Sequence, residues 1–203
     1  LAISISNPNI VYAVVENLNP KDPTKELKTE GMMNTLRDNY YDQLKGGEIY
    51  RSDNGGQSWL KMNDDKFNVS SKAAYSFNQI FCNPKNPDNL WVLSDAMHIS
   101  FDAGKTWTGF EGDTTHYLEA MFGDHRTMWL DCKDGSHILL GSDGGVYETF
   151  DGGKTTRHFY QIPVEEIYAV GYDYLTPYNI YLGLQDHDVW RGPSNSWAGE
   201  IGP

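Results

Sequence analysis

The sequence predicts an all-β protein of the β-propeller type, and three observations support this fold class. Nearly the same eight residues occur three times, starting at Ser52, Ser100 and Thr149. The starts are 48 and 49 residues apart, and at such a period each repeat forms one four-stranded blade. Each copy also follows a short stretch in which apolar or aromatic residues alternate with others, as in half-buried strands.

A second phrase recurs between the copies, with two strand-like stretches on either side of a turn rich in Pro, Asn or Asp. Its four occurrences are Ile5–Ala13, Ile80–Val92, Trp129–Leu140 and Tyr168–Leu182. Another predicted strand directly precedes each eight-residue copy, at Ile49–Arg51, Met97–Ile99 and Val146–Glu148. Each repeat is therefore expected to form three strands and then a turn that leads into a fourth.

The eight-residue copies themselves predict tight turns. A short side chain in each can accept hydrogen bonds from nearby backbone N–H groups, and a glycine two residues later can adopt a positive φ. The turn residues are Ser52, Asn54, Gly56, Trp59, Ser100, Asp102, Gly104, Trp107, Thr149, Asp151 and Gly153. We expect no calcium at these turns, because Ca²⁺ needs about 6–8 converging oxygens and the first copy has Asn54 in place of the acid.

The pattern Ser-x-Asp-x-Gly-x-Thr-Trp resembles the Asp-box, or BNR repeat, of sialidases, xyloglucanase-type glycoside hydrolases and sortilin-type receptors. All three copies share it, with Asn54, Thr149 and Thr156 as departures. The stretches Leu140–Tyr147 and Gly183–Ser194 are similar to bacterial proteins described as BNR-repeat or sortilin-like glycosyl hydrolases. The resemblance implies a propeller and a location outside the cytoplasm, but no activity, since one fold hosts many functions.

The repeats supply about three blades and part of a fourth, whereas propellers close with about 4–8. We therefore expect residues 1–203 to be part of a larger propeller, with its other blades from the rest of the chain or from another subunit. A polar insertion at 16–47 interrupts the first blade. Apolar residues at near-helical spacing predict a short amphipathic helix there, either as a surface decoration or as a partner-binding element.

The net charge of −12 argues against binding to nucleic acid, which requires clusters of Lys and Arg. The sequence contains no apolar run long enough to cross a membrane. It also lacks a phosphate-binding loop and a Gly-x-Ser-x-Gly motif, so no cofactor is expected. Cys82 and Cys132 occupy nearly equivalent places in adjacent repeats, which leaves both a disulfide and free thiols open.

Two segments near the predicted inner strands combine polar and aromatic side chains that suit a ligand at the channel mouth. The expected ligand-binding residues are His125, Arg126, Gln185, Asp186, His187 and Trp190. A metal site of His116, His125 and His187 is a weaker alternative, because their spacing matches no zinc motif.

Two functions from different classes remain open. The first is a module that binds or assembles with a protein or glycan, and the second is a glycoside hydrolase. A hydrolase needs two carboxyl groups at a defined separation, for which Asp124 and Asp186 are the weak candidates. Related sequences often carry an acid where this chain has Arg126 and Thr127, so we favour the binding module and expect no competent catalytic pair in this segment.

Overall fold

The computed structural model describes residues 1–27, 43–64, 67–70, 74, 76–95, 97–109, 121–153, 155–159, 162 and 164–195. Within these ranges the chain forms fifteen strands and no helix. It divides into two units, Leu1–Phe159 and Tyr160–Pro203, which are described separately below. The prediction of an all-β fold is confirmed.

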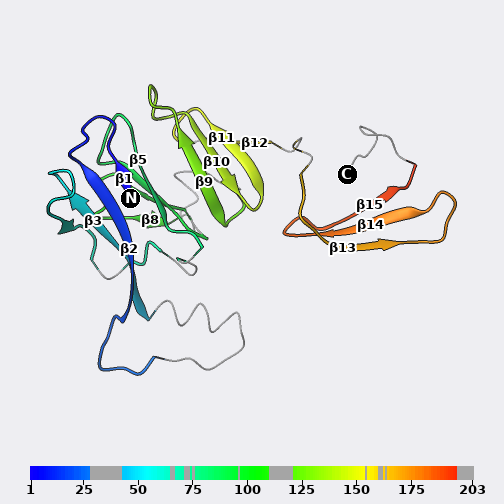
Figure 1. The fold of residues 1–203 in the computed structure, drawn as a ribbon, viewed down its shortest axis with the longest axis horizontal. Helices are drawn as coiled ribbons and strands as arrows, with labels where there is room; N and C mark the ends of the chain where they lie inside the picture. The colour runs from blue at the N-terminus through cyan, green and yellow to red at the C-terminus, as the bar shows by residue number, and fades with distance from the viewer. Residues whose placement is uncertain are drawn as a thin grey trace. The chain divides into compact units, whose positions relative to one another are not determined.

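The first unit contains three antiparallel four-stranded sheets whose strands follow one another in chain order (Figure 1). Sheet 1 consists of β1 (Ala2–Ile3), β2 (Val11–Pro20), β3 (Leu44–Ser52) and β4 (Leu60–Lys61). Sheet 2 consists of β5 (Gln79–Cys82), β6 (Leu90–Leu93), β7 (Met97–Ser100) and β8 (Thr108–Gly109). Sheet 3 consists of β9 (His125–Leu130), β10 (Ile138–Ser142), β11 (Gly145–Thr149) and β12 (Arg157–His158).

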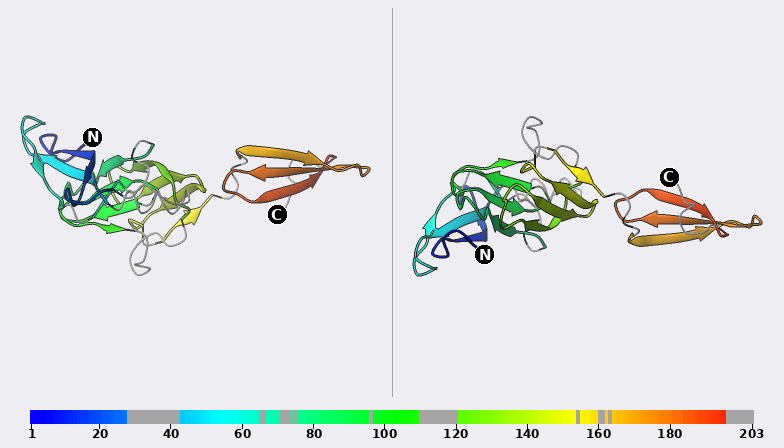
Figure 2. Two further views of the ribbon diagram at one scale, coloured as in Figure 1. Left: turned by 90° about the horizontal axis from the view of Figure 1, so that it is seen from below. Right: turned by 90° about the horizontal axis from the view of Figure 1, so that it is seen from above.

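The second unit contains sheet 4, in which β13 (Ile167–Tyr172), β14 (Asn179–Leu184) and β15 (Val189–Pro193) pair antiparallel in the same order. The four sheets thus repeat one plan, as the blades of a propeller do. In the first unit the leading strand β5 contacts both β1 and β9, so the leading strands of the three sheets are neighbours. Figure 2 shows the ribbon from two further sides.

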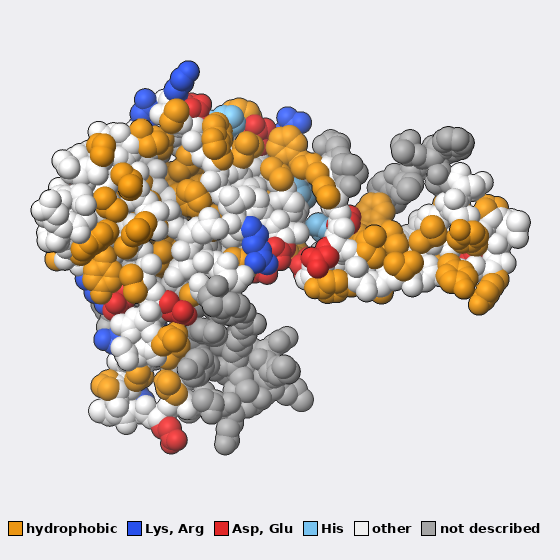
Figure 3. Space-filling model, in the orientation of Figure 1, with side chains coloured by type: hydrophobic (Ala, Val, Ile, Leu, Met, Phe, Trp, Pro, Cys, Tyr) orange, Lys and Arg blue, Asp and Glu red, His pale blue; other side chains and the backbone are white. Residues whose placement is uncertain are grey.

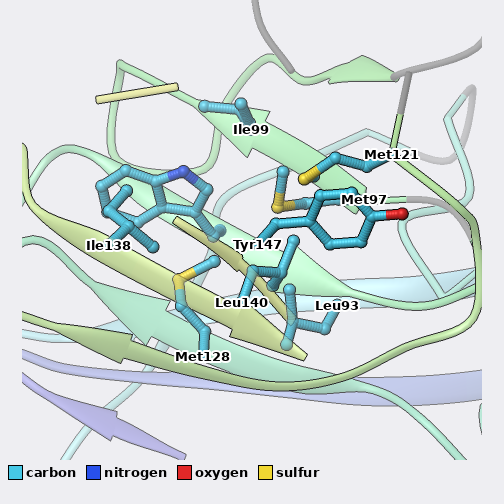
Figure 4. Close-up of a cluster of buried hydrophobic side chains, with 9 residues drawn as sticks. Leu93, Met97, Ile99, Met121, Met128, Ile138, Leu140 and Tyr147 are labelled. Atoms are coloured by element: carbon cyan, nitrogen blue, oxygen red, sulfur yellow. The ribbon is translucent and has the colours of Figure 1, made fainter. Parts of the chain in front are cut away.

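Sheet 2 is buried on both faces because sheets 1 and 3 cover it. Leu90 and Val92 on one face of β6 belong to an apolar cluster shared with sheet 1. Trp91 and Leu93 on the opposite face belong to a second cluster shared with sheet 3 (Figure 4). The alternation follows from the period of two along a strand, and the two clusters form the core of this unit.

The first two strands of every sheet are joined by a turn of the same kind. A backbone N–H at the start of the turn donates to a carbonyl at its end in all four sheets. The pairs are Ser4 with Ile10, Asn83 with Asn89, Asp131 with His137, and Asp173 with Asn179. The repeated strand–turn–strand phrase predicted from the sequence is therefore confirmed, and these pairs align the four sheets position by position.

The three eight-residue copies join the third and fourth strands of sheets 1, 2 and 3, as predicted. In the second copy the buried Ser100 Oγ accepts a hydrogen bond from the N–H of Gly104 at 2.9 Å and donates one to Asp102 Oδ1 at 2.9 Å. Asp102 accepts from the N–H and hydroxyl of Thr106, and the Trp107 indole donates to the Gly104 carbonyl. The carboxylate therefore binds its own turn.

The first and third copies reproduce the hydroxyl and side-chain acceptor bonds of this arrangement with substituted residues. The hydroxyls of Ser52 and Thr149 take the place of Ser100, and Asn54 and Asp151 take the place of Asp102. As predicted, the key glycines have positive φ angles of 90°, 85° and 99° at Gly56, Gly104 and Gly153. An amide oxygen serves as well as a carboxylate at this position, so the turn depends on an acceptor and not on charge.

The insertion in sheet 1 is shorter than the range 16–47 predicted from the sequence. Strand β2 continues to Pro20 and β3 begins at Leu44, because the pairing of the two strands extends beyond Glu16 and Gly47. The two strands form a long hairpin that projects beyond the sheet (Figure 1). The predicted helix falls largely on residues 28–42, outside the described residues. Cys82 and Cys132 are free thiols.

Candidate functional site

The inner strands β5 and β9 begin at the same end of the first unit as the β6–β7 and β10–β11 turns. The N–H of His125 donates to the Ser94 carbonyl, and that of Asp124 to the Asp95 carbonyl, both at 3.0 Å. The next turn is joined to this strand as well, because the N–H of Asp143 donates to the Asp124 carbonyl at 3.3 Å. These bonds hold the predicted residues Asp124 and His125, at the start of sheet 3, against the β6–β7 turn of sheet 2.

Arg126 is the centre of a polar cluster at this end, which we call the Arg126 site (Ser76, Phe77, Gln79, Arg126 and Asp143). Its guanidinium forms a two-point contact with the Asp143 carboxylate, at 2.7 and 2.9 Å, and a third bond to Ser76 Oγ at 3.1 Å. It also lies over the Phe77 ring, 4.4 Å from the centroid. The Gln79 side-chain amide donates to the Arg126 carbonyl.

The Arg126 side chain remains 45 % exposed in spite of these contacts. A bidentate Arg–carboxylate pair fixes the plane of the guanidinium more firmly than a single contact would. The site therefore presents a fixed, planar cation with a serine hydroxyl, an amide and a carboxylate beside it. Such a surface can stack on a sugar ring or a planar side chain and can bond to hydroxyl and amide groups.

Asp124 adopts a φ of 57°, a left-handed conformation in which Asp and Asn are the common non-glycine residues. The backbone on both of its sides is held by the bonds to Asp95 and Asp143 described above. This weak catalytic candidate thus lies next to the Arg126 site. Its conformation alone gives the carboxyl no catalytic role.

His125 is placed differently from the prediction, because its side chain is only 1 % exposed. Burial lowers its pKa to about 4, against a smaller opposing effect of the Asp95 carboxylate. A neutral, enclosed imidazole does not face a ligand on the surface. We therefore leave His125 out of the group of residues that can contact a ligand directly.

The second unit carries the other predicted residues at its β14–β15 turn. The turn contains two aspartates with positive φ, Asp186 and Asp188, both at 59°. Asp186 accepts a hydrogen bond from the Gln185 amide, while His187 lies 2.6 Å from a Glu165 carboxylate oxygen. The turn is therefore closed by contacts among its own polar residues and the segment before β13.

Trp190 is 38 % exposed, and its indole donates to the His187 carbonyl at 3.2 Å. When the sheets are aligned by their first turns, Trp190 faces Leu182 just as Tyr147 faces Leu140. Tyr147 is a core residue of the first unit. Trp190 thus occupies the place in the repeat that a core residue fills in sheet 3, and its role in ligand binding stays a prediction.

The histidine metal site predicted as an alternative is not assembled in the described residues. His116 lies outside them. Among the described residues, no group of three or more His, Cys, Asp or Glu side chains is arranged for a metal ion.

The sequence interpretation missed the residues that hold Arg126, namely Asp143, Ser76, Phe77 and Gln79. One signal could have identified Asp143. The dipeptide Ser-Asp recurs where the second strand of two successive repeats ends, at 94–95 and at 142–143, which puts an acid in the turn that follows this strand. Ser76 and Phe77 come from the segment before β5, which carries no repeated pattern.

No protein-family model matches this chain, and no curated protein matches it either. Solved structures do resemble it. A GH74 enzyme of Niastella koreensis has a TM-score of 0.51 and 13 % identity, with 95 % of this chain and 28 % of that enzyme covered. The GH74 xyloglucanase of Xanthomonas campestris has a TM-score of 0.50 and 13 % identity, with 94 % and 28 % covered.

The structure of YCF48 bound to D1 peptide is a weaker match, with a TM-score of 0.40, 17 % identity, and 68 % of this chain and 43 % of that chain covered. That likeness is too low to support an argument. This chain spans less than a third of the length of the two GH74 enzymes. At 13 % identity the likeness shows the fold alone, and the fold is a segment of a β-propeller.

Proposed function

We propose that this chain is a binding module whose ligand contacts the Arg126 site. The observation that carries the proposal is a half-exposed guanidinium held in one orientation by Asp143, Ser76 and Phe77. A solvent-exposed ion pair contributes only about 0–1 kcal/mol to stability, so stability alone is a weak reason for this arrangement. A fixed planar cation beside polar groups is a common component of recognition surfaces.

The ligand we propose is a glycan, with a protein partner as the other outcome of the test. Asp143 and Ser76 accept three hydrogen bonds from the guanidinium, and the Phe77 ring lies against it. A phosphate or carboxylate would compete with Asp143 for the guanidinium. The hydroxyls of a neutral sugar can instead bond to the polar groups around it without displacing Asp143.

A glycan array followed by calorimetry at pH 7.5 tests the proposal. We expect a glycan that binds the wild type to bind Arg126→Gln at least about tenfold more weakly, a loss of roughly 1.4 kcal/mol. Arg157→Gln is the matched control, because Arg157 also lies over a phenylalanine ring, that of Phe159, at 4.7 Å. Equal loss in the two variants, or no loss in Arg126→Gln, contradicts the proposed site.

A glycoside hydrolase is the second candidate function, supported by the likeness of fold to the two GH74 enzymes. It requires a second carboxyl group about 5–5.5 Å or 6.5–9.5 Å from the first. We propose that this segment lacks a complete pair and does not turn over substrate. Hydrolysis of xyloglucan or of a sialoside that is lost on Asp124→Asn or Asp186→Asn would instead establish the hydrolase, since Asn tolerates the positive φ of both positions.

We further propose that the three hydrogen-bonded turns are Asp-boxes of the BNR type, and that the protein acts outside the cytoplasm. The turn geometry at Ser52, Ser100 and Thr149 supports the first proposal.

No helix of the described residues is long and apolar enough to cross a membrane. The remaining blades come from the rest of the protein or from another subunit, and the mass of the native protein in solution distinguishes these two sources.

A further inference from the structure

Two imidazoles are buried beside the start of β9. His98, on β7, is 5 % exposed, and His125, the first residue of β9, is 1 % exposed. The Nδ1 atom of each is buried without a hydrogen-bond partner. Buried polar atoms of native proteins are rarely left unpaired, so each such atom calls for an explanation. Neither histidine takes part in the Arg126 site.

The charged group that acts on both imidazoles is the Asp95 carboxylate of the β6–β7 turn. It also accepts a hydrogen bond from the Ser94 hydroxyl. The segment that follows β4 contributes the Phe67 ring, edge-on to His98 at 4.9 Å. The guanidinium of the neighbouring Arg126 is engaged with Asp143 instead. Both rings are thus buried, and the Asp95 carboxylate acts on each of them.

Both histidines are neutral at pH 7 for a physical reason. Desolvation by burial lowers the pKa of each to about 4, and it outweighs the opposing attraction of Asp95. The positive charge of a protonated His125 would lower the pKa of His98 further. A proton therefore enters either ring readily only when that ring becomes exposed to water.

The backbone of His125 and of the residue before it fastens β9 to the β6–β7 turn. The N–H groups of Asp124 and His125 donate to the carbonyls of Asp95 and Ser94. The contact is close, since a Cβ on Gly123 would lie 2.9 Å from the Asp95 carbonyl oxygen. An opening that breaks these two bonds would free the start of β9, where Arg126 directly follows His125.

We propose that His98 and His125 form an acid-sensitive latch, which holds the start of β9 against the β6–β7 turn at neutral pH and releases it when either imidazole gains a proton. The effect on ligand binding rests on the proposed function of the Arg126 site. The latch itself does not, and it can be tested without any ligand. A metal ion is not the explanation in the described residues, because no suitable group of ligands is present there.

Amide hydrogen exchange of the full protein between pH 7.5 and 4.5, corrected for intrinsic rates, tests the latch. We expect the opening equilibrium of the Asp124 and His125 amides to rise at least about tenfold between pH 6.5 and 4.5. The Gly152 amide, which donates to the Ser136 carbonyl in sheet 3, is the reference and should not follow this change. An equal rise at Gly152, or none at Asp124 and His125, overturns the proposal.

Variants connect the opening to the two rings. His98→Leu and His125→Leu remove the titrating group, and each should reduce the acid-induced rise at Asp124, whereas His137→Gln elsewhere in sheet 3 should leave it intact. Imidazole titration by NMR in the wild type does not depend on the folding of any variant. Midpoints near 6.5 for both rings would overturn the latch, and midpoints well below that value support it. Weak glycan binding at pH 7.5 would contradict the Arg126 site alone.

Discussion

Sheets 2 and 4 contain the same strand pattern but differ in burial. In β6 the four residues Leu90–Leu93 are all buried, none more than 4 % exposed. In sheet 4, Val170 is 68 % exposed and Tyr172 is 67 % exposed, and apolar side chains cover β13–β15 in the space-filling view (Figure 3). Alternating apolar residues thus make a strand in both sheets, but only a covering sheet on each face makes a core.

When the repeats are aligned, residues of sheet 4 can be compared with residues at the same position in sheet 3. Leu140 of β10 faces Met128 and Tyr147, and Leu182 of β14 faces Val170 and Trp190 at the equivalent positions. Leu140 is buried in the cluster shared by sheets 2 and 3, whereas Leu182 is half-buried. The two leucines therefore have the same place in the repeat and a different packing environment.

The largest effect is expected from truncation of these leucines. Leu140→Ala should destabilise the first unit by about 2–5 kcal/mol, because it leaves a cavity in a packed core. Leu182→Ala should cost roughly 1 kcal/mol or less in the second unit, where fewer contacts are lost. Urea unfolding of each variant, followed by hydrogen exchange of both units, measures the two costs. Equal costs would mean that sheet 4 is packed as tightly as sheet 3 in the native protein.

The next largest effect is a difference between the two units in how their stability depends on acidic pH. The pKa values of His98 and His125 are lowered by burial to about 4, so the unfolded chain binds more protons than the folded one between pH 6.5 and 4. The stability of the first unit is thus complete above pH 6.5, and it should fall by something on the order of a few kcal/mol as the pH drops toward 4.

Asp173 gives the second unit a pH dependence of the same sign, but at a lower pH. Hydrogen bonds, chiefly those from Asn179, lower the pKa of the Asp173 carboxyl to about 2. Its stabilising contribution is present above the unfolded value of 3.8 and is lost as the pH falls through 2. Acid unfolding monitored separately for each unit should show the first unit weakening at a higher pH, and a simultaneous transition would contradict this order.

The third effect concerns the turns that sheets 1, 2 and 3 share. Asp102→Ala should destabilise the first unit by roughly 1–2 kcal/mol, because it removes the acceptor for the N–H and hydroxyl of Thr106. Asp102→Asn should cost less, since Asn54 fills this role in the first turn. Thermal melting with and without calcium checks both points, and a calcium-dependent shift that Asp102→Ala abolishes would refute the purely structural role.

The sequence allowed these turns to be predicted residue by residue because their bonds are local. Ser100, Asp102, Gly104 and Thr106 lie within seven residues, so a repeated octapeptide determines the whole hydrogen-bond pattern. The strand order followed for the same reason, since each sheet is built from consecutive strands.

The candidate site was less predictable because its contacts join distant parts of the chain. Arg126 is held by Ser76, 50 residues away, and by Asp143, 17 residues away, and no local pattern connects them. His125 is a polar residue of the kind expected at a channel mouth, yet its side chain is buried beside the β6–β7 turn. Burial of a polar side chain depends on the adjacent blade, and periodicity along one strand does not reveal it.

The smallest effect isolates the backbone from packing. Gly152 has a φ of 72°, and a Cβ there would meet no atom within 4 Å. Gly152→Ala should therefore destabilise the first unit by about 1 kcal/mol through strain in the left-handed region alone. Gly192 lies at the aligned position of Ser52, Ser100 and Thr149 in sheet 4 and also has open space around its Cβ position, but no positive φ. Gly192→Ala should be neutral or slightly stabilising, because alanine restricts the unfolded chain. Thermal unfolding of both variants decides the matter: if the two substitutions have equal effects, conformational strain does not distinguish the tight turn of sheet 3 from the end of β15.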